Sequence, residues 1–197
     1  MAISLDIIIA NGGIQKKYRK GDIIFSEGEQ CNYYHQIVQG SIKMFNFNQD
    51  EKEFTQGIFS AGESFGEPPL FINLPYPASA EATSDTTIIR LAKQNFLGLM
   101  DAYPDLCKQM LNLLANRTYS KSITTRIIIN SSPEVRILSF LDYYKLKYGT
   151  HEEKELIPLK RQEIANHTAL RVETVIRTLR QLKEEGKVEI LNRKLFY

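Results

Sequence analysis

The sequence predicts an α+β fold in three parts, and three features of the chain lead to this expectation. Short strand-forming runs alternate with glycines up to about residue 92, a long stretch without glycine or proline comes next, and the last forty residues have the pattern of two helices and a hairpin. We expect an antiparallel β-roll over residues 1–102, a long helix over 103–131 and a winged helix-turn-helix over 132–197. With 197 residues, the chain is long enough to bury the cores that these parts need.

The first part is rich in β-branched and aromatic residues that are grouped in short runs. The clearest of these runs are Ile23–Phe25, Gln36–Val38, Ile42–Phe47 and Thr86–Leu91. Glycines separate the runs at spacings expected of an antiparallel barrel or jelly roll, which is a double-stranded β-helix. A short helix over residues 94–99 is expected to close this part.

The second part is a stretch that begins after Pro104 and has no glycine or proline before Pro133. As a helix, residues 105–130 would be about 40 Å long at about 1.5 Å per residue. Leu106, Met110 and Leu113 have the 4-then-3 spacing of an apolar stripe. Such a stripe either packs within its own chain or pairs two long helices in a homodimer, and the choice depends on the segment after the helix.

A further helix is expected over residues 134–148, because Pro133 can begin it and Gly149 can end it. Its predicted buried side consists of Val135, Leu138, Leu141 and Tyr144 or Tyr143. The polar residues 150–155 then connect it to the last segment.

Residues 159–197 carry the strongest functional signal in the chain. A first helix over 161–167 has the small residue Ala165 where two helices of a helix-turn-helix must approach closely. A second helix over 171–182 repeats apolar residues at helical spacing, namely Leu170, Val175, Leu179 and Leu182. The two strand-like runs on either side of Asn192 and Arg193 predict a wing.

The second of these helices directs Arg171, Glu173, Thr174, Arg177 and Arg180 outward. Arginine matches the O6/N7 edge of guanine, glutamate accepts from cytosine N4, and threonine can contact a phosphate or a thymine methyl group. The alternative is an ordinary solvated helix, since a Glu–Arg pair four residues apart is common on such surfaces. The order of helix, turn, arginine-rich helix and wing favours DNA binding.

The charge distribution agrees with DNA as a partner. Residues 160–197 hold nine basic and five acidic side chains, whereas residues 1–100 hold eight basic and eleven acidic ones. Local positive charge supplies most of the sequence-independent affinity for DNA, because it neutralises phosphates and releases counterions. A DNA-binding head next to the long helix also favours the homodimer, whose predicted interface residues are Leu106, Met110, Leu113, Arg117 and Ile127.

Neither the cysteines nor the N-terminal residues indicate export. Cys31 and Cys107 are far apart and form no CxxC pair, so the sequence predicts neither a disulfide framework nor an iron–sulfur or zinc site. The apolar run at residues 7–10 is too short for a signal peptide or a membrane span. We expect a cytoplasmic protein with no membrane partner.

A catalytic role has little support in the sequence. A jelly roll can house the metal of a cupin-type enzyme, but such a site needs two or three histidines and a carboxylate on facing strands. His35, His151 and His167 fall in three separate predicted elements. We therefore expect no metal, no cofactor and no enzymatic activity.

Taken together, the motifs resemble those of a known family. A roll with Gly21-Asp22, Gly28, Gly40 and Gly66-Glu67, then a long helix and a helix-turn-helix with a wing, resembles the family of the cyclic-AMP receptor protein and the fumarate–nitrate reduction regulator (Crp/Fnr) over residues 15–197. The resemblance implies that the roll binds an effector, the long helix pairs two subunits and the second helix of the head enters the major groove. The implied partners are double-stranded DNA, a second copy of the chain and RNA polymerase.

The resemblance extends to individual residues of the head. The family's Arg-Gln-Glu-Ile motif is Arg161 to Ile164 here, with Arg161 at a phosphate-contacting position. In the family's Arg-Glu-Thr-Val-x-Arg motif the leading arginine is replaced by Val172, and Arg171 lies one residue earlier, which implies a different base preference. The predicted DNA-binding residues are Arg161, Gln162, Arg171, Val172, Glu173, Thr174, Arg177, Arg180 and Arg193.

The effector pocket is where this sequence departs from the family. The Gly-Glu pair that binds the ribose is present as Gly66-Glu67, but the Arg-Ser pair that holds the cyclic phosphate falls on Tyr76-Pro77, and the purine-contacting Thr-Ser pair becomes Lys121-Ser122. A buried phosphodiester needs a charged partner, and Lys43 or Lys52 could supply it only if the fold brings one of them inward. We therefore do not expect cyclic AMP to bind, and the effector is unknown or absent.

Other roles for the roll depend on the same part of the chain. We expect the Glu67 carboxylate to bind backbone amides of the following turn in preference to a ribose. Iron–sulfur sensing is not expected because the family's N-terminal cysteine cluster is missing, and a haem would need His35 or Cys31, which we expect to be packed. A cyclic-nucleotide-binding subunit that regulates a partner protein is the alternative, and the missing arginine and the basic wing both weaken it.

Overall fold

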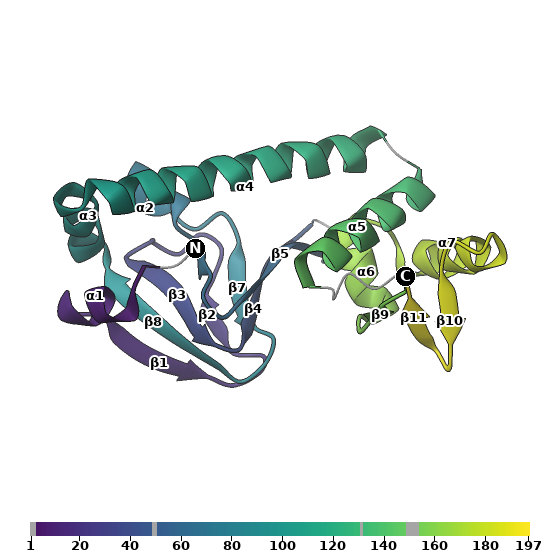
Figure 1. Ribbon diagram of the computed structural model, residues 1–197, viewed down its shortest axis with the longest axis horizontal. Helices are drawn as coiled ribbons and strands as arrows, with labels where there is room; N and C mark the ends of the chain where they lie inside the picture. Colours follow the sequence, from purple (N-terminus) through teal and green to yellow (C-terminus); the bar gives the residue numbers. More distant parts are fainter. Residues whose placement is uncertain (1–2, 49–50, 131, 149–153) are drawn as a thin grey trace. The chain divides into compact units, whose positions relative to one another are not determined.

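The computed structural model describes residues 3–48, 51–130, 132–148 and 154–197 (Figure 1), and side chains are not described for 126–130 and 147. The chain divides into two compact units. The first comprises residues 1–47 and 55–119, and the second comprises residues 48–54 and 120–197. The division falls within the long helix, so its two ends belong to different units.

The first unit is an antiparallel β-roll made of two four-stranded sheets. One sheet has the order β1 (Ile14–Tyr18), β8 (Thr86–Ala92), β3 (Tyr33–Gln39), β6 (Ser64–Phe65); the other has the order β2 (Ile23–Phe25), β7 (Ser79–Ala82), β4 (Ser41–Phe47), β5 (Glu53–Ser60). The four predicted strand-forming runs all lie in these strands, which confirms the predicted fold class of this part. Strands β1, β5, β6 and β7 are additional.

The turn between β3 and β4 shows why glycine is needed at residue 40. Gly40 has φ +89°, a conformation that side chains with a Cβ rarely adopt. A Cβ at this position would lie 2.5 Å from the backbone oxygen of Asp85 and from Oγ1 of Thr86. The glycine therefore permits a tight connection that brings the two sheets of the roll together.

Three short helices complete the roll. The apolar run near the N-terminus folds as α1 (Leu5–Ala10), which buries Ile8 completely. Helix α2 (Pro68–Ile72) begins at the proline pair that comes after Glu67. Helix α3 (Lys93–Ala102) is longer at both ends than the predicted helix and buries Phe96, Leu99 and Met100 against the sheet.

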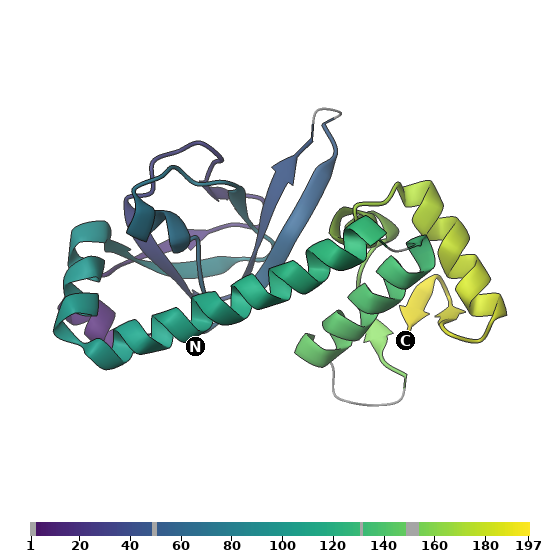
Figure 2. The same ribbon diagram turned by 90° about the horizontal axis from the view of Figure 1, so that it is seen from above.

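Helix α4 (Pro104–Asn130) has the predicted extent, and its first half runs along the roll (Figure 2). Met110 is 6% exposed within the roll core, and Leu106 and Leu113 pack against the same core. Arg117 also turns to the roll, where it binds Glu67. Within one chain the roll covers Met110 fully and covers Leu106, Leu113 and Arg117 in part, so the predicted dimer interface stays a prediction. The side chain of Ile127 lies outside the described residues.

The second unit contains the predicted winged helix-turn-helix. This head consists of α5 (Pro133–Tyr148), β9 (Leu156–Ile157), α6 (Arg161–Thr168), α7 (Val172–Glu184), β10 (Glu189–Leu191) and β11 (Lys194–Phe196). The strands form one sheet of order β10-β11-β9, and the sequence pattern does not predict its member β9. This strand pairs Ile157 with Leu195 and closes the core under the wing.

The buried side of α5 differs in part from the predicted one. Leu141 is fully buried as predicted, and so is Ile137, which the sequence pattern does not single out. Val135 is 44% exposed, so its predicted place on the buried side is wrong. Of the two tyrosines, Tyr144 packs against the core and Tyr143 is exposed.

Candidate nucleic-acid interface and effector pocket

The turn between α6 and α7 has the close contact expected of a helix-turn-helix. Ala165 is 1% exposed and belongs to the core that both helices share. Ala169 ends α6 in the left-handed conformation, with φ +53°, and Leu170 N–H donates to the Ala165 oxygen at 3.1 Å. At the other end, Lys160 N–H donates to the Glu163 carboxylate at 2.6 Å, which fixes the first turn of α6.

Helix α7 buries one side and exposes the other. Its buried side chains are Val175, Thr178, Leu179 and Leu182. Glu173, Arg177 and Arg180 are exposed, and Thr174 is half-buried at the edge of the same face. This arrangement leaves carboxylate, guanidinium and hydroxyl groups outside a closed core, where each can reach a ligand.

Two residues at the start of α7 differ from their predicted placement. Arg171 is the N-cap, with extended backbone (φ −74°, ψ 146°), and its side chain is exposed. Val172 begins the helix and packs against the core of the head, so it does not face outward as Glu173, Arg177 and Arg180 do. A guanidinium group therefore lies just before the helix, and an apolar side chain takes the first helical position.

The remaining predicted DNA-binding residues lie on α6 and the wing. Arg161 is half-buried, and this burial lowers the pKa of its guanidinium. Gln162 is exposed and donates to Asn166 Oδ1 at 2.9 Å. At the wing tip, Asn192 and Arg193 both have positive φ, +48° and +64°, which is the two-residue hairpin geometry that matches strand twist. The Arg193 side chain is exposed there.

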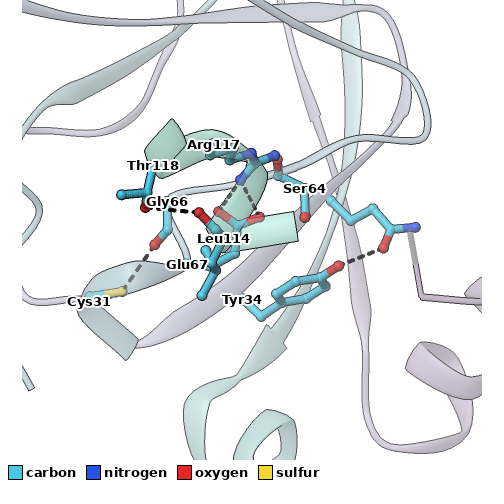
Figure 3. Close-up of polar contacts among 9 residues, drawn as sticks. Cys31, Tyr34, Ser64, Gly66, Glu67, Leu114, Arg117 and Thr118 are labelled. Carbon is cyan, nitrogen blue, oxygen red and sulfur yellow. Dashed lines mark hydrogen bonds and ion pairs between the residues drawn. The ribbon is translucent and has the colours of Figure 1, made fainter. Parts of the chain in front are cut away.

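The candidate effector site is built around a buried carboxylate (Figure 3). Glu67 is fully buried, and both of its oxygens accept from Nη1 of Arg117, at 2.9 and 2.7 Å. Nη2 of Arg117 donates to the Ser64 backbone oxygen at 2.7 Å. The expectation that Glu67 binds backbone amides of the following turn is wrong, because a guanidinium from α4 occupies the carboxylate and no side-chain cap bond forms at α2.

This ion pair joins the long helix to the roll. The Arg117 guanidinium also lies over the Phe59 ring, 5.2 Å from its centroid. A buried charge left without its partner typically costs about 3–5 kcal/mol, so either residue alone would be unfavourable here. Arg117 thus supplies the positive charge that Glu67 requires.

Tyr76 and Pro77, where the resemblance implies the phosphate-binding pair, make other contacts. Tyr76 is 3% exposed and stacks on Phe25 with ring centroids 3.7 Å apart. Its hydroxyl donates to the Tyr33 backbone oxygen at 3.3 Å, and burial raises its pKa. Pro77 is exposed, and its backbone oxygen accepts from Asn46 Nδ2 at 2.7 Å.

Gly66 lies against the Phe25–Tyr76 stack. Its φ is +73°, and a Cβ would come within 3.0 Å of Phe25 and 3.2 Å of Tyr76. Lys121 and Ser122, the remaining residues predicted at the pocket, are exposed on α4 and belong to the second compact unit.

His35 and Cys31 are packed in the roll core, as expected. His35 is 4% exposed among the rings of Phe25 and Phe65, and burial, helped by the charge of Arg90, lowers its pKa to about 3. Burial raises the pKa of the Cys31 thiol. Within the described ranges, no group of three or more His, Cys, Asp or Glu side chains could hold a metal ion. Among the helices described, none is long and apolar enough to span a membrane.

Two family models match successive parts of the chain. The cyclic nucleotide-binding domain matches residues 15–103, and the Crp-like helix-turn-helix domain matches residues 135–196. The chain belongs to the Crp/Fnr family of transcription regulators. The resemblance inferred from the sequence motifs is confirmed.

Relatives in this family are similar over most of their length. The cyclic AMP receptor protein of Thermus thermophilus is 26% identical over 89% of this chain and 80% of its own. The transcriptional activator protein anr of Pseudomonas aeruginosa is 23% identical over 94% of this chain and 75% of its own.

Solved structures share the fold of this Crp/Fnr regulator. The c-di-GMP-responsive global regulator CLP of Xanthomonas campestris matches with a TM-score of 0.85 at 17% identity, over 97% of this chain and 96% of its own. FixK2 of Bradyrhizobium japonicum matches with a TM-score of 0.79 at 20% identity, over 93% and 91% of the two chains.

Proposed function

We propose that this Crp/Fnr regulator acts as a homodimer that binds a pseudo-palindromic operator in double-stranded DNA. The observation that carries the proposal is the outward face of α7, where Glu173, Arg177 and Arg180 project from a helix whose opposite side is fully packed. Two such helices would enter the major groove about 34 Å apart on one side of the duplex. No catalytic role is proposed.

The proposed base and phosphate contacts follow from where each side chain lies. Glu173, Thr174, Arg177, Arg180 and the N-cap residue Arg171 contact bases or the neighbouring backbone. Arg161, Gln162 and Arg193 contact phosphates at the start of α6 and at the wing tip. Val172 supports the first turn of α7 from within the head and is not proposed to touch DNA.

The proposed dimer pairs two copies of α4 through the predicted residues and through a neighbouring stripe that is more exposed. Cys107, Leu111, Leu114 and Thr118 have a 4-3-4 spacing on the flank of the helix. Leu111 is 66% exposed and Cys107 and Thr118 are exposed, while Leu114 is half-buried against the roll core. None of the four carries a charge. An uncharged stripe of this spacing suits the pairing of two parallel helices.

The pocket of this regulator is proposed to be degenerate for cyclic AMP. Glu67 is already neutralised by Arg117, and Tyr76 and Pro77 provide no cation where the family holds the cyclic phosphate. The effector is therefore another small molecule or none.

In this proposal the three predicted parts of the chain have separate roles. The roll over 1–102, the long helix over 103–131 and the head over 132–197 act as sensor, dimerisation and DNA-binding parts. A protein that binds bacterial DNA works in the cytoplasm, and RNA polymerase is the further partner implied by the family. The alternative of a subunit that regulates a partner enzyme is not favoured, since a Crp-like helix-turn-helix spans residues 135–196.

A mobility shift on duplexes selected from a random pool tests DNA binding. We expect retarded complexes at low salt, with affinity falling steeply as salt rises because counterions are released. The double charge reversal Arg177→Glu, Arg180→Glu should abolish the shift. Its matched control is Lys16→Glu, Lys17→Glu on the exposed strand β1, which should leave binding intact. Purified protein that binds no duplex at low ionic strength would overturn the proposal.

A further inference from the structure

Ile176 is an exposed apolar residue on the otherwise polar outer face of α7. Its side chain is 44% exposed, although the buried side of the helix is complete without it. Isoleucine is also a weaker helix former than alanine or leucine, because its branched Cβ loses rotamer freedom. Neither the packing of the head nor helix propensity accounts for isoleucine at this position.

The neighbours of Ile176 place it among the proposed base-reading groups. On a helix, residues three and four positions apart are adjacent, so Ile176 lies between Glu173 and Arg180 on one side and the packed residues Val172 and Leu179 on the other. Ile176, Glu173 and Arg180 are all exposed. Ile176 is the fifth residue of α7, counted from Val172, and thus lies in the N-terminal half that contacts base edges in helix-turn-helix proteins.

We propose that Ile176 reads the 5-methyl group of a thymine in the major groove. Among the four bases, thymine alone presents a methyl group there, and apolar side chains recognise it by contact. The carboxylate of Glu173 and the guanidinium of Arg180 can read hydrogen-bonding edges on either side. A lone exposed isoleucine elsewhere on a surface would need no explanation, but here it would be buried whenever α7 enters the groove.

The inference rests on the proposed DNA-binding function and adds a constraint on the operator. Each half-site should contain a thymine whose methyl group matters more than its hydrogen-bonding edge. Loss of one methyl contact should weaken binding about fourfold, the equivalent of about 0.8 kcal/mol for one buried group of this size.

Uracil substitution tests this directly, because deoxyuridine differs from thymidine only by the missing methyl. Duplexes are first selected with the wild-type protein, and each thymine of a half-site, on both strands, is then replaced by uracil. The dissociation constant is measured for the wild type, for Ile176→Ala and for the control Leu146→Ala, which truncates a side chain on α5 that is 75% exposed. Thermal melting checks that both variants remain folded.

The expected result is one symmetric thymine position at which uracil weakens wild-type and Leu146→Ala binding about fourfold but leaves Ile176→Ala unaffected. This is the non-additivity of two groups in contact. If the wild type binds selected duplexes and uracil has the same effect on all three proteins at every position, the role of Ile176 is disproved while DNA binding stands. If no duplex is bound at low salt, the proposed function itself fails, and this inference fails with it.

Discussion

Arg177 and Arg161 have different surroundings, and these predict different effects on DNA binding. Arg177 is exposed on the outer face of α7, where a guanidinium can bridge the O6 and N7 atoms of guanine. Arg161 is half-buried at the start of α6, where the proposed contact is with a phosphate of the duplex. We expect Arg177→Ala to weaken binding at one base step by roughly 1–3 kcal/mol and to relax specificity there.

Arg161→Ala provides the matched comparison, since it also removes one guanidinium from the head. It should weaken all sequences about equally and reduce the salt dependence of binding. Selection of binding sites with both variants measures the difference. An unchanged selected motif for Arg177→Ala would show that Arg177 does not read bases.

His35 makes the stability of the roll depend on pH. Burial lowers its pKa to about 3, while the unfolded chain titrates near the ordinary value of 6.5. Since the unfolded state binds the proton, the contribution of neutral His35 is complete above about pH 6.5 and is lost as pH falls towards 3. Between pH 7.5 and 5.5 the free energy of unfolding should fall by about 1.4 kcal/mol from this group.

Urea unfolding of the roll at the two pH values measures this effect. His35→Phe keeps an aromatic ring among Phe25 and Phe65 and removes the titrating group. In that variant this part of the pH dependence should disappear. An equal loss of stability in both proteins would mean that other groups cause it.

Arg117 shows where sequence reasoning about single residues reaches its limit. The 4-then-3 spacing correctly grouped Leu106, Met110, Leu113 and Arg117 on one face of the long helix. Spacing cannot say what covers that face, because a second helix and a β-roll both accept an apolar stripe. The buried carboxylate of Glu67, fifty residues away in the chain, binds the guanidinium of Arg117, and helical spacing could not predict this contact.

Among the helices and strands, those with strong local signals could be predicted, and those held by their partners could not. The bounds of α4 and α5 depend on Pro104, Pro133 and the absence of glycine between them. Strand β1 is mostly exposed and reads Ile-Gln-Lys-Lys-Tyr, so it lacks an apolar run and exists because it pairs with β8. The two-residue strand β9 likewise depends on pairing with β11.

The uncharged stripe on α4 predicts that a charge placed at Leu111 prevents dimer formation. Leu111→Glu places a charge in the middle of the proposed uncharged stripe, where burial against a partner would be costly. The variant should be monomeric in light scattering and should bind its operator much more weakly, because the two heads are no longer linked. Ile14→Glu, at a β1 position that is 57% exposed, is the control and should stay dimeric. A dimeric Leu111→Glu protein would show that this stripe is not the dimer interface.

Across the molecule as a whole, the head and the roll match the family's motifs to different degrees. The head keeps the family's motif except at Val172, and its exposed arginines are a consequence of helix periodicity alone. The roll keeps Gly66 and Glu67, whereas Tyr76 and Pro77 stand where the resemblance implies the cyclic-phosphate pair. The sequence does not predict the ion pair of Glu67 with Arg117, because only the tertiary fold brings these two residues together.

This difference predicts a regulator whose DNA binding does not respond to cyclic AMP. A ligand changes DNA affinity only through a difference in its own affinity for the states that bind DNA, and the coupling is reciprocal. With Glu67 neutralised by Arg117 and no cation at Tyr76-Pro77, calorimetric titration with cyclic AMP should show no binding heat. The affinity for a selected duplex should be the same with and without the nucleotide. Titration of the same protein with the duplex is the positive control, and micromolar affinity for cyclic AMP would overturn the account of the pocket.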